Sequence, residues 1–202
     1  MAAATSPTDR RDELLALTLI HDLHVIDPGD PRVLHQHDPA LVRRKLDLES
    51  RLLRRIERSD WNAEHPYLGV LHQRRLDPVE SVRRIAHDDL VPGVYEWVAE
   101  SAELDELRCF LALEGGPDAG FDDLVAVAQV GLAGEAKLEA ASNYWDEMGR
   151  GRAGATHGEL YSRMREALGL PSIDRQRLPV EALERAALLS TLATNRRYQF
   201  EL

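Results

Sequence analysis

The sequence is poor in the residues that mark several protein classes. It has 1 cysteine among 202 residues, and only 5% of its residues are aromatic. A single cysteine excludes a disulfide within the chain and is typical of a reducing compartment, so we expect a cytoplasmic protein. Cys109 lies in an apolar run, which predicts a small buried core residue. Few aromatic residues, with abundant leucine and alanine, favour helices over a β-sandwich or barrel.

Two further absences restrict the partners. No apolar run is long enough to span a bilayer, and the N-terminus lacks a charged segment followed by an apolar one. The formal net charge is −10 and the pI is about 5.3. Non-specific nucleic-acid binding needs a basic surface, and the arginines of residues 41–60 alternate with acidic residues at helical spacing. The sequence therefore predicts neither a membrane nor a nucleic-acid partner.

Hydrophobic periodicity predicts an all-α fold without strands. We expect a disordered N-terminus at residues 1–12, an N-terminal helical region at 13–90, and a helical bundle at 91–202 on which that region packs. Asp38 and Pro39 predict the start of a strong helix. Further helices are expected at 66–76, 94–114, 121–148, and from Pro179 to the last residue.

A glycine-rich corner follows the segment "NYWDEMGRG", and it raises a question about the polar residues around it. Asp146 and Glu147 precede the glycines, and His157 follows them after Thr156, a predicted helix N-cap. These side chains are either solvated capping residues or metal ligands. Helical spacing predicts that two faces point inward, namely Glu139–Asn143–Glu147 with Ala136 and Ala140, and His157 with Leu160, Met164 and Leu168.

Glu114 is the second carboxylate in an unexpected place, because it ends the apolar run "CFLALEGG". Inward-pointing Glu and His side chains in a helix bundle are the usual way to build a non-haem iron or manganese site. Spacing alone leaves the alternative open. Glu114 then precedes a helix stop, Glu147 is exposed, and His157 is a first-turn residue bonded to a carboxylate. His21, His24, His35 and His37 also lie close in sequence, but their spacing matches no structural zinc pattern.

Residues 90–202 resemble the iron-containing redox enzyme family, within the haem-oxygenase-like diiron oxidase/oxygenase superfamily. The matching features are Glu114 in "LALEGG", Glu147 in "NYWDEMGRG" and His157 in "THGELY". The resemblance implies a haem-oxygenase-like bundle of about seven helices that encloses two irons. It implies a cofactor of Fe(II), two per complete site, and oxidation or fragmentation of a small organic substrate with O2. Carried over by motif, the metal ligands are Glu114, Glu147 and His157, with Asn143 and Asp146 as neighbours.

The sequence departs from this family after His157. The family has a further carboxylate and then a His-x-x-x-Asp-x-x-His cluster, whereas His157 is the last histidine of these 202 residues. Three ligands are too few for a diiron site. Either the bundle is incomplete at its C-terminus, which we favour, or another chain completes it, or the chemistry has been lost.

Three functions are therefore compared. The first is a non-haem iron oxidoreductase that takes O2 and a small-molecule substrate, with a pocket lined by Phe110, Tyr144, Trp145 and Met148. The second is a non-catalytic helical protein that binds a partner or forms a homodimer. The third is a metal-free, thiaminase-like bundle enzyme, for which Cys109 is the candidate nucleophile.

Overall fold

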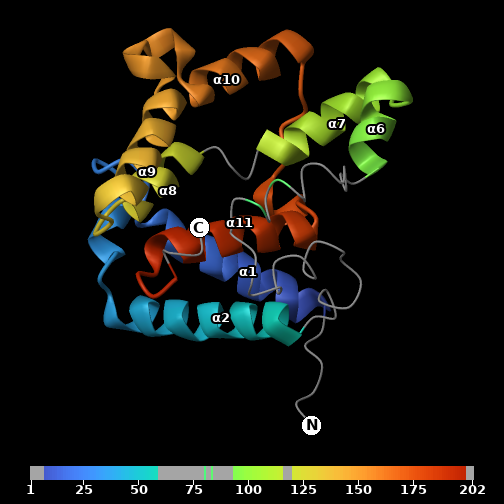
Figure 1. The fold of residues 1–202 in the computed structure, drawn as a ribbon. Coiled ribbons are helices and arrows are strands. Elements are labelled where there is room, and N and C mark those ends of the chain that lie inside the picture. The colour runs from blue at the N-terminus through green and yellow to red at the C-terminus, as the bar shows by residue number, and fades with distance from the viewer. Residues whose placement is uncertain (1–6, 59–79, 81–82, 84–92, 116–119, 199–202) are drawn as a thin grey trace. The chain divides into compact units, whose positions relative to one another are not determined.

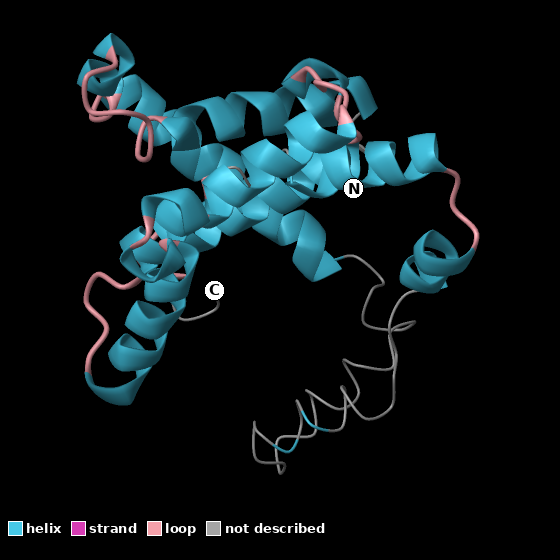
Figure 2. Ribbon diagram, turned by 90° about the horizontal axis from the view of Figure 1, so that it is seen from above, coloured by secondary structure: helices cyan, strands magenta, loops and turns pink. Residues whose placement is uncertain are grey.

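The computed structural model describes residues 7–58, 80, 83, 93–115 and 120–198. These residues form helices joined by turns, and none of them forms a strand (Figures 1 and 2). The all-α fold class predicted from the sequence is confirmed. The α-helices are α1 (Pro7–Asp22), α2 (Pro39–Arg58), α6 (Gly93–Glu100), α7 (Leu104–Gly115), α8 (Phe121–Ala128), α9 (Gly134–Glu147), α10 (His157–Leu168) and α11 (Val180–Thr194).

The chain divides into two units by its contacts. One unit comprises residues 1–53 and 108–202, and the other comprises residues 54–107. The first unit contains α1, most of α2, α7 from Arg108 and the helices that follow it, so the candidate ligands all lie in it. The division at residues 90/91 expected from the sequence lies outside the described residues and remains a prediction.

α11 packs against α1 and α8, and α8 also packs against α9 (Figure 1). Each fully buried leucine contributes roughly 1.5–3 kcal/mol by its removal from water. The buried side chains of this core include Leu14 and Leu17 from α1, Leu48 and Leu52 from α2, Leu124 and Val125 from α8, and Leu183 and Ala187 from α11.

Helix starts were predicted well where a side chain caps them. The Asp38 carboxylate accepts hydrogen bonds from the backbone N–H groups of Ala40 (2.7 Å) and Leu41 (3.3 Å), and Pro39 is the first residue of α2. α1 begins at Pro7, so residues 7–12 are helical rather than disordered. The helix expected at residues 66–76 lies outside the described residues.

Three long helices expected from the sequence are shorter in the structure. The 94–114 helix is broken at Glu103, whose N–H donates to Glu106 Oε2 (2.9 Å) and starts α7 as half of a capping box. The 121–148 helix is broken between α8 and α9, where Gly131 and Gly134 have φ of 90° and 61°. α11 ends at Thr194 instead of continuing to the last residue.

A buried polar network joins α1, α2 and the residue after α11. The Glu49 carboxylate is 1% exposed. Its Oε1 lies 3.0 Å from His21 Nε2 and 2.9 Å from Lys45 Nζ, and its Oε2 accepts from Asn195 Nδ2 at 2.8 Å. Burial raises the pKa of Glu49, but the hydrogen bonds from His21, Lys45 and Asn195 outweigh it, so the pKa of Glu49 is lowered.

His21 near the end of α1 and His24 in the turn after it both have lowered pKa values. Burial lowers the pKa of His21, against the opposing effect of its bond to Glu49. Burial and the nearby Lys45 charge lower the pKa of His24 to about 4, and Gln36 Nε2 lies 3.2 Å from its Nδ1. His35 and His37 are exposed. Among the described residues, no group of three or more His, Cys, Asp or Glu side chains that could hold a metal ion is found.

No helix in the described part of the chain is long and apolar enough to cross a membrane.

Candidate metal centre

The glycine corner between α9 and α10 depends on backbone conformations that favour glycine. Gly149 and Gly151 have φ of 62° and 77°, and Arg150 between them has φ of 54°. A Cβ on Gly149 would lie 2.4 Å from the carbonyl carbon of Ala155, which is backbone and has little freedom to move. The corner therefore brings the end of α9 against the start of α10 only because Gly149 has no side chain.

The start of α10 is fixed by the expected cap. Thr156 has extended backbone, and its Oγ1 accepts a hydrogen bond from the N–H of Glu159 at 3.3 Å. His157 is the first residue of α10, and Glu147 is the last residue of α9. The cap and the corner together place these two side chains opposite each other.

Glu147 and His157 form a direct pair. His157 Nδ1 lies 2.5 Å from Glu147 Oε2. The Glu147 side chain is 14% exposed and that of His157 is 59% exposed. The inward orientation expected for His157 is therefore wrong, because α10 buries none of its residues. Since Nδ1 faces the carboxylate, Nε2 of His157 remains the nitrogen that is accessible from solvent.

Glu114 has a different partner. Arg185 of α11 reaches it with a guanidinium group, and Arg185 Nη1 lies 3.0 and 3.2 Å from the two carboxylate oxygens. Arg185 Nη2 also donates to the Glu114 carbonyl oxygen at 2.9 Å. The Glu114 side chain is 44% exposed, so this pair is at the surface of the unit rather than in its core. A cation thus already compensates the charge of Glu114.

One cavity nevertheless contains all three residues expected as ligands. It has a volume of about 710 Å³ and is lined by Glu114, Glu147 and His157. Asp122 of α8 also lines it, and it adds a carboxylate that the sequence analysis did not include. We call this the donor cavity. Its apolar lining is Leu111, Phe121, Met164 and Leu189, in place of the expected Phe110, Tyr144, Trp145 and Met148.

The donor types fit iron, and their arrangement fits it in part. Carboxylate oxygens and imidazole nitrogen are ligands that Fe(II) accepts. Glu147 and His157 are already in contact, which brings one carboxylate and one imidazole side by side. Among the described residues, however, no three His, Cys, Asp or Glu side chains gather closely enough to hold one metal ion. The structure therefore places two of the three expected ligands together and leaves Glu114 with Arg185.

The neighbours expected around the site lie elsewhere. Asp146 forms an ion pair with Arg150 (2.7 Å), and this hydrogen bond lowers the pKa of Asp146. Asn143, Glu139 and Asp146 line a separate cavity of about 550 Å³. The inward face expected for α9 is wrong, since α9 has no buried residue and Glu139 and Asn143 are exposed. A helical pattern reports which residues share a face, and packing decides whether that face is covered.

Cys109 and Arg185 are the two residues for which the sequence was most misleading. Cys109 is exposed on α7, so the prediction of a buried residue is wrong. Its apolar neighbours are half-buried, and the helix turns the thiol outward. Arg185 was not singled out, because an arginine within "EALERAALL" carries no motif, and only the packing of α11 against the unit brings it to Glu114.

Substitution of Gly149 by alanine is expected to destabilise the glycine corner. The added Cβ meets backbone atoms of Ala155 at a positive φ, so we expect a loss of about 1–3 kcal/mol in the free energy of unfolding. Gly154→Ala is the matched control, because a Cβ there meets no atom within 4 Å. Chemical denaturation of both variants measures the difference. Equal stability of the two variants would contradict the corner described here.

Comparisons with known proteins found one similar family. No curated protein and no solved structure matches the chain. Residues 109–202 match the model of the family described as iron-containing redox enzymes, and this range includes Glu114, Glu147 and His157. By this match, residues 109–202, which are fewer than half of the chain, are similar to the iron-containing redox enzyme family.

Proposed function

We propose that the protein is a non-haem iron enzyme that uses O2 to oxidise a small organic substrate. The observation that carries this proposal is the donor cavity, where Glu114, Glu147 and His157 line one space within the family-matched segment. In this proposal Glu147 and His157 would hold iron, and Glu114, which pairs with Arg185 in this structure, would be the third ligand. A complete site with two irons would require donors beyond these three residues.

The iron, when bound, supplies the electrons and the coordination positions that O2 chemistry requires. The chain's own residues have other tasks. Glu147 orients the imidazole of His157 through its bond to Nδ1. Arg185 compensates the Glu114 carboxylate in the absence of metal. Leu111, Phe121 and Met164 form an apolar wall that limits water in the cavity.

The remaining parts of the proposal concern partners. A volume of about 710 Å³ lies within the range of roughly 300–1,000 Å³ typical of small-molecule sites. The acidic net charge of −10 supports a small molecule over a nucleic acid. A homodimer and a cytoplasmic location remain predictions from the sequence.

The experiment that tests the function is metal loading. The chain is incubated with ferrous iron without oxygen, excess metal is removed, and the bound iron is counted before O2 is admitted. We expect iron to be retained in stoichiometric amount and an absorbance band to develop only after O2 is added. Retention no higher than that of a protein without metal ligands would overturn the proposal.

One observation favours a second candidate, a non-catalytic protein that binds a partner through α9 and α10. Neither helix buries a residue, and Leu138, Trp145 and Leu160 on them are 69%, 55% and 45% exposed. Under this alternative Glu147→Ala leaves self-association unchanged, as sedimentation measures. The metal-free enzyme has less support, because Cys109 is not among the residues that line the cavities described here.

A further inference from the structure

A second, smaller cavity lies beside the donor cavity and is lined mainly by polar groups. Its volume is about 220 Å³, and it is lined by residues of α1, α7, α10, α11 and the segment from Pro171 to Leu178. We call it the polar cavity. Its charged lining residues are Asp22, Arg165 and Arg175, and hydroxyl groups are supplied by Thr18, Ser172 and Ser190.

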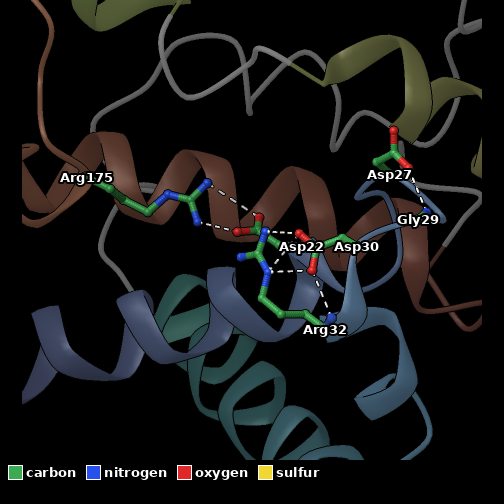
Figure 3. A network of polar contacts seen from close by, with 6 residues as sticks. All are labelled: Asp22, Asp27, Gly29, Asp30, Arg32 and Arg175. Carbon is green, nitrogen blue, oxygen red and sulfur yellow. Dashed lines mark hydrogen bonds and ion pairs between the residues drawn. The ribbon is translucent and has the colours of Figure 1, made fainter.

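Two of the three charges in the polar cavity compensate each other. Arg175 Nη1 donates to Asp22 Oδ2 at 2.5 Å, and Arg175 Nη2 lies 3.4 Å from Asp22 Oδ1 (Figure 3). This leaves the guanidinium of Arg165. Within the described part of the chain, its recorded interaction is with the ring of Tyr161, whose centroid lies 5.9 Å from Arg165 Cζ. No carboxylate of these residues pairs with Arg165, so the lining has a net positive charge.

That positive charge is unusual for this chain. With a net charge of −10, the protein as a whole repels anions. A guanidinium without a carboxylate partner in a cavity presents several N–H donors at a fixed geometry, and it pairs preferentially with carboxylate or phosphate oxygens. The hydroxyl groups of Ser172 and Ser190 line the same cavity and can donate to the same oxygens.

Tyr161 and Arg165 connect the two cavities. Both residues line the polar cavity and the donor cavity. The Tyr161 ring occupies this position because Gly115 has no side chain, since a Cβ there would lie 2.1 Å from Tyr161 Cε2. The Tyr161 hydroxyl also donates to the Leu111 carbonyl oxygen at 3.4 Å. The two cavities therefore meet at Tyr161 and Arg165.

We propose that the polar cavity binds the oxyanion end of a small organic molecule, with Arg165 as its main recognition group, while the rest of the molecule extends into the donor cavity. The sizes agree with this division. The polar cavity, at about 220 Å³, is smaller than the roughly 300 Å³ of typical small-molecule sites, so it accommodates a head group, whereas the donor cavity of about 710 Å³ accommodates the remainder. The substrate class of the proposed enzyme is thus a small anionic molecule, and only this last statement rests on the proposed function.

The test is calorimetric titration of the metal-free full chain with three six-carbon probes, hexanoate, hexyl phosphate and hexan-1-ol. We expect at least one anion to bind at least tenfold more tightly than the alcohol, which corresponds to about 1.4 kcal/mol. The tighter of the two anions identifies carboxylate or phosphate as the head group. Arg165→Ala is expected to weaken anion binding at least tenfold, and Arg165→Lys to weaken it less.

Arg177→Ala is the matched control, because Arg165 and Arg177 are both exposed arginines and only Arg165 lines the polar cavity. It is expected to bind the anions like the unchanged chain. Equal affinity for anion and alcohol, or equal affinity of the Arg165→Ala and Arg177→Ala variants, would overturn the proposal. The anion titration contains no metal, so its result does not depend on the iron-loading experiment. If the chain binds the anions but retains no iron, the anion site is supported and only the proposed iron function is contradicted.

Discussion

Glu49→Ala is expected to lower the free energy of unfolding by about 3–5 kcal/mol, which is the usual cost of removing one partner from a buried charge pair. Glu49 is 1% exposed and Lys45 is 8% exposed, so the substitution leaves a buried ammonium without its counter-charge. It also removes the acceptor for His21 at the end of α1 and for Asn195 directly after α11. Chemical denaturation followed by circular dichroism measures the loss.

Glu57→Ala serves as the control for this substitution. Glu57 lies on the same helix and is exposed, so its removal is expected to change stability by no more than about 0.5 kcal/mol. The double variant Glu49→Leu with Lys45→Met removes both charges, and it is expected to recover part of the loss because no uncompensated charge remains. If Glu49→Ala and Glu57→Ala are equally stable, the network does not hold α1, α2 and α11 together.

The same network gives the direction of the pH dependence. The pKa values of His21 and His24 are lowered from 6.5, so below pH 6.5 the unfolded chain binds protons that the folded chain does not. The stabilising contribution of both histidines is therefore complete above pH 6.5 and is lost as the pH falls through the folded pKa, which is about 4 for His24. The lowered pKa of Glu49 adds a further loss below pH 4.5. In Glu49→Ala that last component is expected to be absent.

Glu147→Ala and His157→Ala are each expected to weaken ferrous iron binding by about 10- to 100-fold or more, because each removes one of the two donors that already lie together. The measurement is an anaerobic titration against a competing chelator, which gives a dissociation constant independent of any enzymatic activity. Thermal unfolding of the metal-free variants is expected to change little, since α9 and α10 bury none of their residues.

Glu139→Ala is the matched control for iron binding. The substitution removes a carboxylate from the same helix, two turns before Glu147. Glu139 lines the separate cavity that also contains Asn143 and Asp146, and it does not line the donor cavity. Arg185→Gln tests whether Glu114 is a ligand, because it removes the cation that pairs with this carboxylate. If Glu114 binds iron, the substitution strengthens iron binding. An unchanged dissociation constant for iron shows that Glu114 is not a ligand. Identical constants for Glu147→Ala, His157→Ala and Glu139→Ala would contradict the assignment of the pair.

Local chemistry was predictable from the sequence wherever one short segment contains both partners of an interaction. Asp38 caps α2 and Thr156 caps α10, because a side-chain oxygen two or three residues before an N–H group can reach it whatever the rest of the chain does. The glycine corner was predictable for the same reason. It brings together Glu147 and His157, only ten positions apart.

The predictions that were wrong concern the burial of side chains and the continuity of a helix. The sequence patterns of α9 and of Cys109 predicted buried faces, and these residues are exposed, because burial depends on a neighbouring helix that periodicity does not specify. The 121–148 helix was expected to be continuous, and the positive φ values at Gly131 and Gly134 divide it.

The sequence by itself determined the helical class, the caps, the glycine corner and, through its family motifs, the three candidate ligands. Only the tertiary structure decided that Arg185 forms an ion pair with Glu114 and that Asp122 lines the donor cavity. It also decided that Arg165 lines both cavities, where its described partner is the Tyr161 ring. It also decided the burial of Glu49 with His21, Lys45 and Asn195. Most of these contacts join residues far apart in the chain, and no local rule of spacing or propensity can predict which distant side chains a helix will meet when it packs.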